Sequence, residues 1–423
     1  MRVALWNHRQ LADWVWEARQ RTLQLVEDLD DAQLLGPRLP IVNPLLWEIG
    51  HVAWFQEKWV LRQAWGDPPL RADADSLYDS TAIPHDTRWD LPLPSRRQTL
   101  DYLLAVRDRV LEKLSGEVPE DRLYYVLLSL FHEDMHDEAF TYTRQTLGYP
   151  PPAFLPPSPA GAGPLPGDVR LPGGTLMLGS SPREPFVFDN EKWAHPVEVG
   201  PFSIARAPVT QAEFAAFVDD GGYRRQDLWT DEGWAWRQRT GAQHPLHWRR
   251  GDGGWLRMHF DRPVPLEPHR PVLHVNWYEA QAFCRWAGRR LPSEAEWEMA
   301  ASLSPQGKLR YPWGDQPDAA RANLDWRGGG CVDVAALPEG DSPWGCRQML
   351  GNVWEWTSSD FLPFPGFVPD PYKEYSAPWF GDHKVLRGGC WVTRSRLVRN
   401  AYRNFYKPDR RDVWAGFRTC ALE

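Results

Sequence analysis

Apolar side chains recur every three or four positions in four stretches of the first 148 residues, the spacing that places them on one face of a helix. The stretches cover residues 8–28, 43–65, 95–114 and 119–147. Asn43 caps the second stretch and Pro44 lies in its first turn, while Gly148 and Pro150 end the fourth. Four amphipathic helices in succession predict a four-helix bundle.

Two connecting stretches differ from these helices in composition. Residues 67–94 are polar and contain proline, and a loop of that length is uncommon unless it is functional or disordered. Residues 149–167 read YPPPAFLPPSPAGAGPLPG, and so many prolines exclude a helix or a central strand. We interpret this second stretch as a semi-rigid spacer in preference to a binding segment.

After residue 167 the pattern changes to short strand-like runs broken by glycine, proline and asparagine. Asn276 predicts a helix over 277–288, and Ser293 with Glu296 forms a capping box that predicts a helix over 297–303. No repeat of 20–50 residues is visible, which argues against a propeller or solenoid. The chain is therefore expected to be an α+β protein with a helical bundle over 1–148, a proline-rich linker over 149–167 and one irregular domain over 168–423.

Composition narrows the classes of function. The 423 residues carry 48 basic and 56 acidic side chains, a net charge of −8, which argues against a nucleic-acid partner. No apolar run approaches the roughly 18 residues of a membrane span, and the first residues do not resemble a signal peptide. Five cysteines without a CxxC pair favour a reduced protein. We expect a cytoplasmic enzyme or binding protein that needs no membrane.

The strongest chemical motif is HEDMH over residues 132–136, inside the fourth predicted helix. Residues four apart project from the same helix face, so His132 and His136 can bind one metal ion. Two alternatives stay open. The histidines can be core residues satisfied by hydrogen bonds, or the string can be the HExxH motif of a zinc metalloprotease with Glu133 as the general base. The metzincin extension is absent, because its glycine and third histidine are replaced by Ala139 and Tyr142.

A third ligand is expected from another helix, as in other bundle-core metal sites. His51 lies in the middle of the second predicted helix among Trp47, Trp54 and Phe55. Three neutral imidazoles suit zinc, copper or iron(II) and leave coordination positions open, and spacing alone does not choose between these metals. Glu138 lies about 200° around the helix from His136, so it is expected to contact another element and not the metal.

At this point the residues resemble the non-haem iron sulfoxide synthases of ergothioneine biosynthesis. The resemblance rests on His51, on the HxxxHxE string from His132 to Glu138, and on motifs of the second half, which are PVTQAEF (208–214), VNWYEA (275–280), RLPSEAEWE (290–298), YPWG (311–314), GNVWEW (351–356) and RGG (387–389). It covers essentially the whole chain. It implies a DinB-like four-helix bundle followed by a domain that resembles formylglycine-generating enzymes and has a C-type-lectin-like core. Those enzymes use a cysteine pair near the C-terminus, whereas this chain has only Cys390 and the distant Cys420 there.

The resemblance implies an enzyme that uses Fe(2+) and O2 to join a sulfur donor to the imidazole C2 of hercynine (N-α-trimethylhistidine). His51, His132 and His136 would hold the iron. In some members a tyrosine of a Y-x-x-Y-S-x-P segment donates a proton, and the segment YKEYSAP (372–378) matches it, so Tyr372 is the catalytic candidate. A phenol can supply such a proton; the alternative is that Tyr372 is a core tyrosine of an aromatic-rich domain.

The segment RNFY (403–406) is similar to the family's RNW-type segment, whose asparagine and following aromatic residue contact hercynine. Asn404 and Phe405 inherit that role, since an aromatic face suits a quaternary ammonium group. Tyr406 departs from the pattern, because members that use γ-glutamylcysteine have an acidic residue there. The resemblance also allows a structural calcium ion near residues 351–356.

Two further departures concern the donor. Met135 stands where ergothioneine enzymes usually carry glutamine, and the loop from Tyr78 to Arg88 lacks an arginine pair for a dipeptide carboxylate. Both features look closer to selenoneine synthases, which join hercynine to a selenosugar (1-seleno-β-D-glucose). We therefore predict a C–Se bond-forming enzyme with Met135, Tyr78 and Arg88 near the donor. The alternatives are an ergothioneine sulfoxide synthase that uses cysteine or γ-glutamylcysteine, a zinc protease, and a lectin-like module without catalysis.

Overall fold

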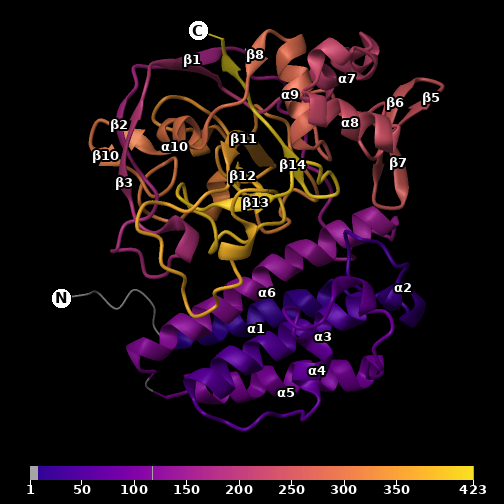
Figure 1. The fold of residues 1–423 in the computed structure, drawn as a ribbon, viewed down its shortest axis with the longest axis vertical. Coiled ribbons are helices and arrows are strands. Elements are labelled where there is room, and N and C mark those ends of the chain that lie inside the picture. Colours follow the sequence, from indigo (N-terminus) through magenta and orange to yellow (C-terminus); the bar gives the residue numbers. More distant parts are fainter. Residues whose placement is uncertain (1–7, 117, 423) are drawn as a thin grey trace. The chain divides into compact units, whose positions relative to one another are not determined.

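The computed structural model describes residues 8–116 and 118–422 and divides the chain into two units, Met1–Phe154 and Leu155–Glu423 (Figure 1). Residues 149–167 form neither helix nor strand. The last part of this stretch belongs to the second unit, because the backbone N–H groups of Ala162 and Gly163 donate to Asp333 Oδ2 at 2.9 and 2.8 Å. The proline-rich stretch is thus tied to the second unit well before its last residue.

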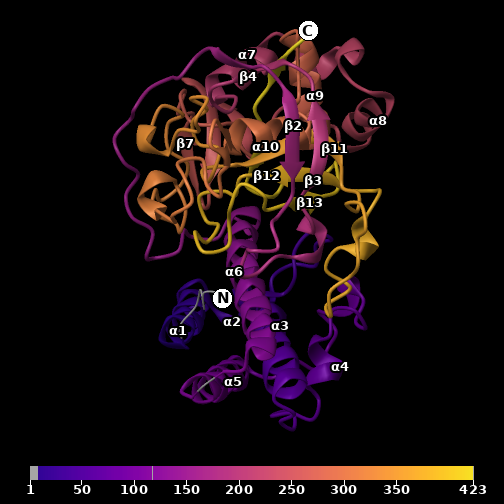
Figure 2. The ribbon, with the colours of Figure 1, turned by 90° about the vertical axis from the view of Figure 1, so that its left-hand side faces the viewer.

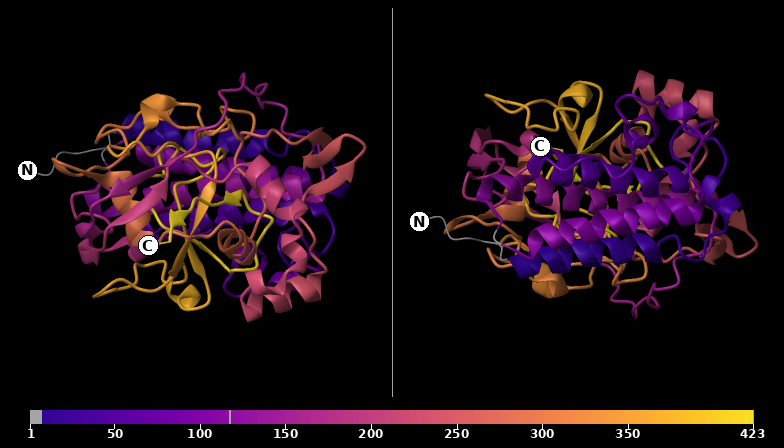
Figure 3. Two further views of the ribbon diagram at one scale, coloured as in Figure 1. Left: turned by 90° about the horizontal axis from the view of Figure 1, so that it is seen from above. Right: turned by 90° about the horizontal axis from the view of Figure 1, so that it is seen from below.

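The first unit contains the long helices that the apolar pattern predicts. Helices α1 and α3 each pack against both α5 and α6, which is the arrangement of a four-helix bundle (Figure 3). The second predicted helix is α3 continued by a π-helical segment, η1. The helical segments are α1 (His8–Gln24), α2 (Asp31–Leu35), α3 (Leu45–Gln56), η1 (Glu57–Ala64), α4 (Ala74–Tyr78), η2 (His85–Thr87), α5 (Arg96–Leu114) and α6 (Glu120–Leu147).

Polar groups set several helix ends. Ser95 caps α5 in a capping box with Gln98, and Gly148 ends α6 in the left-handed conformation. Helix α1 ends at Gln24, so the predicted end at residue 28 is wrong. The cause is that guanidinium groups take up carbonyl oxygens beyond Gln24: Arg144 donates to Leu25 O at 2.8 Å and Arg96 to carbonyls further on.

The segment 67–94 is ordered by short helices and not by a long loop. Its helix α4 lies against α3, and η2 follows before α5 begins. The importance of this segment is that α4 reaches the side chains of α3 that include His51, as described below.

The second unit is an irregular α+β domain, as predicted. Its larger sheets have the strand orders β1-β4-β15-β8 and β13-β12-β11-β14, and in the latter only β11 and β14 run parallel. Figure 2 shows the antiparallel pair β2 and β3. The strands are β1 (Asp168–Leu171), β2 (Gly174–Leu178), β3 (His195–Val199), β4 (Phe202–Ala205), β5 (Trp248–Gly251), β6 (Gly254–His259), β7 (Arg262–Pro265), β8 (Arg289–Arg290), β9 (Leu303–Ser304), β10 (Gly307–Lys308), β11 (Trp354–Asp360), β12 (Lys384–Arg387), β13 (Asn404–Tyr406), β14 (Ala415–Gly416) and β15 (Cys420–Ala421).

The α-helices of this unit are α7 (Gln211–Asp219), α8 (Asp231–Thr240), α9 (Trp277–Trp286) and α10 (Glu294–Ser302). The predicted caps Asn276 and Ser293 are confirmed, but α10 begins directly after its cap and not at residue 297. Helices α7 and α8 were not predicted, although Thr210 and Glu213 form a capping box before α7.

The core of the second unit combines indole rings with buried ion pairs. Arg387 donates to Glu294 at 2.7 Å and also pairs with Glu298, and Arg418 pairs with Glu355 at 2.6 Å. Such pairs fix strand β12 against α10, which aligns the neighbouring strand β13. The fully buried indole rings in the core of the second unit are those of Trp297, Trp326, Trp354, Trp356 and Trp391.

Candidate metal centre

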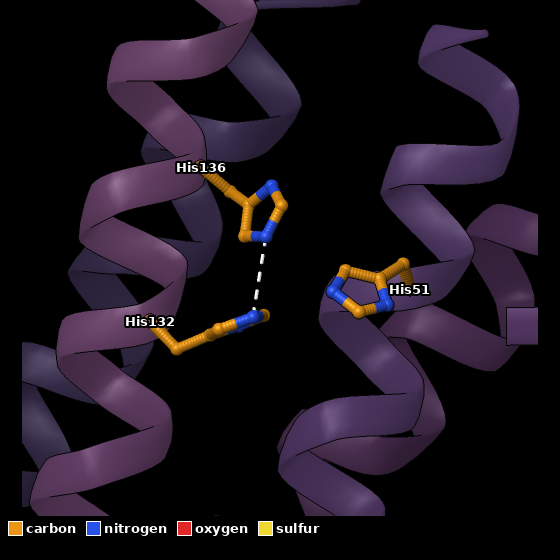
Figure 4. A group of neighbouring side chains, drawn as sticks. All are labelled: His51, His132 and His136. Atoms are coloured by element: carbon orange, nitrogen blue, oxygen red, sulfur yellow. Dashed lines mark hydrogen bonds between the residues drawn. The ribbon is translucent and has the colours of Figure 1, made fainter. Parts of the chain in front are cut away.

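Three histidines from two helices of the first unit point toward one another (Figure 4). His51 comes from α3, and His132 and His136 come from successive turns of α6. One ligand nitrogen of each lies within 4.8 Å of the others, and the Nε2 atoms of His132 and His136 are 3.2 Å apart. Two nitrogens that each bind one ion at ~2.1 Å lie about 3.0–3.4 Å apart, so this pair is already spaced for a shared metal.

The imidazole of His51 is fixed by its surroundings. Its Nδ1 lies 2.8 Å from the carbonyl oxygen of Tyr78, to which it donates, and its ring stacks on Trp47 with centroids 4.8 Å apart. A proton held on Nδ1 leaves the Nε2 lone pair for a metal.

The other two histidines are held differently. His136 Nδ1 lies 2.6 Å from Oε1 of Glu48, a carboxylate buried on α3. A carboxylate behind a ligating imidazole fixes its tautomer and makes it a stronger donor. His132 lies flat on Phe55 with centroids 3.6 Å apart, and its Nδ1 has no hydrogen-bond partner among the described residues.

The electrostatics of the site favour the neutral imidazole at His51 and at His132. Burial lowers the pKa of His51 well below its usual value, and the neighbouring imidazole of His136 acts in the same direction. The pKa of His132 is lowered well below its usual value for the same reasons. The neutral form is the one that binds metals, so His51 and His132 are in the protonation state that coordination requires.

The donor set fits a metal that accepts three nitrogens and keeps open positions. Within residues 8–116 and 118–422, this is the one group of at least three histidine, cysteine or acidic side chains gathered closely enough to hold an ion. Three imidazoles with a carboxylate behind one of them suit iron(II), zinc or copper alike.

Glu133 does not belong to this site. Both of its carboxylate oxygens pair with Arg19, at 2.7 and 3.1 Å, and the hydroxyl of Thr22 lies 2.9 Å from Oε1. The group is buried in the bundle core and neutralised there. It is therefore unable to activate water as the general base of a HExxH protease requires.

The loop residues predicted near the donor are packed into the bundle. Tyr78 is fully buried, and its backbone carbonyl, not its phenol, reaches His51. Arg88 lies over the Trp47 ring at 4.0 Å and donates to Asn43 Oδ1 at 2.6 Å, and burial lowers its pKa to about 10. Met135 is half-buried on α6 beside His136. Substrate contacts for these residues stay predictions.

In the second unit, Tyr372 and Tyr375 share one loop with ring centroids 6.3 Å apart. Tyr375 stacks on Phe188 at 4.4 Å, and burial together with Tyr402 raises its pKa well above the usual range. Tyr372 is half-buried. Tyr375 is half-buried as well, so the two tyrosines differ in their partners and not in their exposure: the Tyr375 ring packs on Phe188 and its hydroxyl forms a hydrogen bond with Tyr402.

The segment that includes the short helix η3 (Asp189–Glu191) anchors this loop on both sides of Tyr372. Lys192 Nζ donates to both carboxylate oxygens of Asp370, at 2.6 and 2.7 Å. The hydroxyl of Ser376 donates to Asp189 and accepts from Asn190 Nδ2 at 3.1 Å. Two polar anchors from one segment thus fix where Tyr372 lies within the unit.

The residues predicted to contact hercynine lie on strand β13. Phe405 stacks on Phe361 at 4.0 Å and lies 5.9 Å from the Tyr375 ring. Asn404 Oδ1 accepts from the N–H of Phe405 at 2.8 Å, and Tyr406 has the guanidinium of Arg410 5.2 Å from its ring. The structure thus brings Phe405 and Tyr372 around the same aromatic side chain, Tyr375.

Polar side chains of residues 351–356, where calcium was expected, are already engaged. Asn352 Oδ1 accepts from Asn323 Nδ2 and from the N–H of Val332, both at 2.9 Å. Glu355 accepts from Trp297 and Arg418. The side-chain oxygens named here already accept hydrogen bonds from the protein. The calcium ion therefore stays a prediction.

Sequence analysis missed the groups that support the histidines. Glu48 lies three residues before His51, a spacing that places both on neighbouring positions of one helix face, so it could have been found. The role of the Tyr78 carbonyl could not, because a backbone group leaves no trace in the residue type.

Comparisons with known proteins cover both units. Residues 16–139 match the DinB superfamily, and residues 154–422 match the sulfatase-modifying factor enzyme 1-like domain. The hercynine oxygenase of Mycolicibacterium thermoresistibile is 41% identical over 98% of this chain and 95% of its own length. That of Mycobacterium tuberculosis is 40% identical over 97% and 98%, respectively. The formylglycine-generating enzyme of Streptomyces coelicolor is 34% identical over 64% of this chain and 96% of its own.

In the parts of the chain that the structure describes, no helix combines the length and the apolar character needed to cross a bilayer.

Proposed function

Since this chain belongs to the hercynine oxygenase family, we propose that it is an iron(II)- and O2-dependent oxidoreductase that bonds the sulfur or selenium of a small donor to the imidazole C2 of hercynine. The observation that carries the proposal is the convergence of His51, His132 and His136 within 4.8 Å, at a place where burial lowers the pKa of His51 and of His132 well below the usual value. The identity of 40–41% with hercynine oxygenases over nearly the full chain supports it independently.

The reaction balances with O2 as the oxidant. The C2–H bond of hercynine and the S–H or Se–H bond of the donor are broken, and one C–S or C–Se bond forms. One oxygen atom ends on the sulfur or selenium, and the other leaves as water with both hydrogens. When held by the three histidines, iron(II) would activate O2 by electron transfer, while the electrons that finally reduce O2 come from hercynine and the donor.

Each group of the chain has a defined task in this proposal. His51, His132 and His136 hold the iron, with Glu48 and the Tyr78 carbonyl fixing the outer nitrogens of two of them. Tyr372 delivers a proton to the reduced oxygen, whereas the hydroxyl of Tyr375 is engaged with Tyr402 and its pKa is raised well above the usual range.

Recognition of hercynine is assigned to the aromatic group of the second unit. Phe405 offers an aromatic face for the trimethylammonium group, and the side-chain amide of Asn404 offers a donor for the carboxylate. Tyr406 and Met135 are proposed to contact the substrates beside them.

The donor is proposed to be a selenosugar of the 1-seleno-β-D-glucose type. The supporting observation is that Arg88, the one arginine of residues 78–89, is already committed to Trp47 and Asn43. A donor without carboxylates needs no further cation from this loop. A thiol donor, cysteine or γ-glutamylcysteine, is the second candidate, favoured by the similarity to hercynine oxygenases.

The test is O2 consumption by the full chain after anaerobic loading with Fe(II). We expect consumption and a C2-substituted product only when hercynine and donor are both present, and loss of both in His136→Ala. Turnover by His136→Ala would contradict the metal site. Ligand binding without O2 consumption would favour a lectin-like module, and peptide cleavage without O2 would favour a zinc protease.

Donor choice is measured by competition in the same assay. Selenoglucose, cysteine and γ-glutamylcysteine are offered together with limiting hercynine, and the products are separated by mass. A preference for either thiol would overturn the selenosugar assignment while leaving the reaction class intact.

A further inference from the structure

One face of α3 and η1 is devoted to holding the short helix α4. Five side chains on this face, spaced three or four residues apart, donate hydrogen bonds to α4 or to the residue after it. The donors and acceptors are Trp47 to Leu77 O (2.7 Å), His51 to Tyr78 O (2.8 Å), Trp54 to Asp75 Oδ1 (2.7 Å), Lys58 to Asp79 Oδ2 (3.1 Å) and Arg62 to both oxygens of Asp75 (2.6 and 2.9 Å).

An ion pair between Arg62 and Asp75 holds the N-terminal end of α4. Hydrogen bonding to Arg62 lowers the pKa of Asp75 to about 2, so the Asp75 carboxylate stays charged at any physiological pH. Asp75 accepts from both Trp54 and Arg62. The C-terminal end of α4 is the end that meets His51. There Trp47 and His51 donate to the carbonyl oxygens of Leu77 and Tyr78, and Lys58 pairs with Asp79 directly after the helix.

Gly50 makes the contact between His51 and the Tyr78 carbonyl possible. A Cβ atom at Gly50 would lie 2.2 Å from Cε1 and 2.3 Å from Cζ of Tyr78, distances that real Cβ atoms do not show. Gly50 lies inside a helix, where glycine costs about 0.5–1 kcal/mol relative to alanine. The benefit of glycine at this position is room for the Tyr78 ring, which is completely buried against it.

We propose that Gly50 and α4 are the positioning elements of the metal centre. The close approach at Gly50 lets the Tyr78 carbonyl reach His51 Nδ1, which holds the proton on that nitrogen and presents Nε2 to the metal. This inference rests on the proposed function only in taking His51 as a metal ligand. Gly50 touches neither metal nor substrate and acts through His51.

In this proposal the segment 67–94 has a function at the metal centre. The segment orients a ligand from outside the bundle, in the way that partners behind metal-binding histidines do, and loss of such partners costs 10- to 100-fold in metal affinity. A merely structural role for Gly50 would alter the stability of the bundle but would not change the metal affinity or the ligand field of a folded variant.

The test uses Co(II) as the probe, with affinity from titration and geometry from its visible d–d bands. In Gly50→Ala we expect the Tyr78 ring to be displaced, the dissociation constant for Co(II) to rise about 10- to 100-fold and the d–d bands to shift. Tyr78→Ala removes the ring but keeps the carbonyl, so adding Gly50→Ala to it should change Co(II) affinity by less than about threefold.

Two controls separate the outcomes. Gly116→Ala is the matched control, because a Cβ there meets nothing within 4 Å, and it should bind Co(II) like the wild type. His51→Ala tests the centre itself: if it binds Co(II) as tightly as the wild type, the proposed metal site fails. If His51→Ala loses Co(II) but Gly50→Ala retains wild-type affinity and spectrum, the positioning inference alone fails.

A second variant decides the matter if Gly50→Ala does not fold. Asp75→Ala releases Trp54 and Arg62 without touching Gly50, Tyr78 or His51. We expect it to fold and to bind Co(II) about 3- to 10-fold more weakly, as a partial loss of the full effect. Unchanged affinity and spectrum in this variant would contradict a role for α4 in orienting His51.

Discussion

At the scale of single residues, the three histidines differ in the partner behind each ring. His136 has a carboxylate, His51 has a backbone carbonyl, and His132 has an aromatic face. A charged acceptor strengthens an imidazole as a donor more than a neutral one does. The centre is therefore expected to be asymmetric, with His136 as its strongest ligand.

Glu48→Gln tests this asymmetry, because it keeps the size of the side chain and removes its charge. We expect Co(II) and Fe(II) affinity to fall about 10- to 100-fold, measured by titration of the folded protein. Glu112→Gln, an exposed position on α5, is the control and should change nothing. Equal affinity in Glu48→Gln would show that the carboxylate serves packing alone.

Substitutions of Tyr372 and Tyr375 are expected to have different effects, although both residues lie on one loop. Tyr372→Phe should reduce C–S or C–Se product and divert the donor to oxidation, with the melting temperature unchanged. Tyr375→Phe should mainly destabilise the second unit, by about 1 kcal/mol, because a buried hydrogen bond involving Tyr402 is lost. Product analysis by mass and thermal unfolding check the pair, and unchanged product from Tyr372→Phe would remove it from the mechanism.

Two half-buried histidines away from the metal site, His247 and His259, predict how the stability of the chain depends on pH. Burial lowers the pKa of His247 and of His259 to about 4, whereas a histidine in the unfolded chain has a pKa of about 6.5. Below pH 6.5 the unfolded state binds protons that the folded state excludes, so the free energy of unfolding decreases as the pH falls toward 4. Each group contributes at most about 1.4 kcal/mol per pH unit.

The measurement is urea denaturation at pH 7, 6 and 5. His259→Gln should lose less stability between pH 7 and 5 than the wild type, because one of the excluded protons no longer enters the balance. The same slope in variant and wild type would show that His259 titrates normally in the folded chain.

At the scale of elements, the sequence predicts best where side-chain periodicity is regular. The four long helices follow from their apolar spacing, and α9 and α10 follow from their capping residues. The π-helical form of η1 could not be predicted, because Glu57–Ala64 keeps a helical pattern of residue types. Helix α4 was missed since its five residues are too few for any period to be visible.

The same limit applies to the site. His132 and His136 follow from a four-residue spacing on one helix, and His51 follows from the expectation that a bundle brings facing helices together. Glu133 shows that neighbours in the sequence need not face the same site: it follows His132 directly, yet its side chain points into the core toward Arg19. Only the direction of each side chain separates the HExxH motif from a bundle metal site.

The anchors of the loop that contains Tyr372 can be tested one at a time. Ser376→Ala removes the anchor to Asp189 and Asn190 and leaves the one between Lys192 and Asp370. We expect faster amide hydrogen exchange over residues 371–378 and a product distribution shifted toward that of Tyr372→Phe. Lys373→Met, whose exposed side chain lies between the anchors, is the control. Faster exchange without a change in products would limit the anchor to a structural role.

At the scale of the whole molecule, the proposed tasks divide along the chain. The three histidines, Glu48 and α4 all belong to the unit Met1–Phe154, which has its own buried core. Tyr372, Asn404 and Phe405 belong to the unit Leu155–Glu423. This division separates metal binding from turnover, which a fragment can test.

A fragment of residues 1–154 is expected to fold as a helical bundle and to bind Co(II) with d–d bands like those of the full chain, because every ligand and every group behind the ligands is present in it. It should form no product from hercynine, donor and O2, because the residues assigned to substrate recognition and proton delivery are missing. Circular dichroism verifies the fold, titration measures the metal, and mass spectrometry measures the product. Product formation by the fragment would refute the roles given to Tyr372, Asn404 and Phe405. A folded fragment without Co(II) affinity would instead show that the second unit is needed to complete the metal centre.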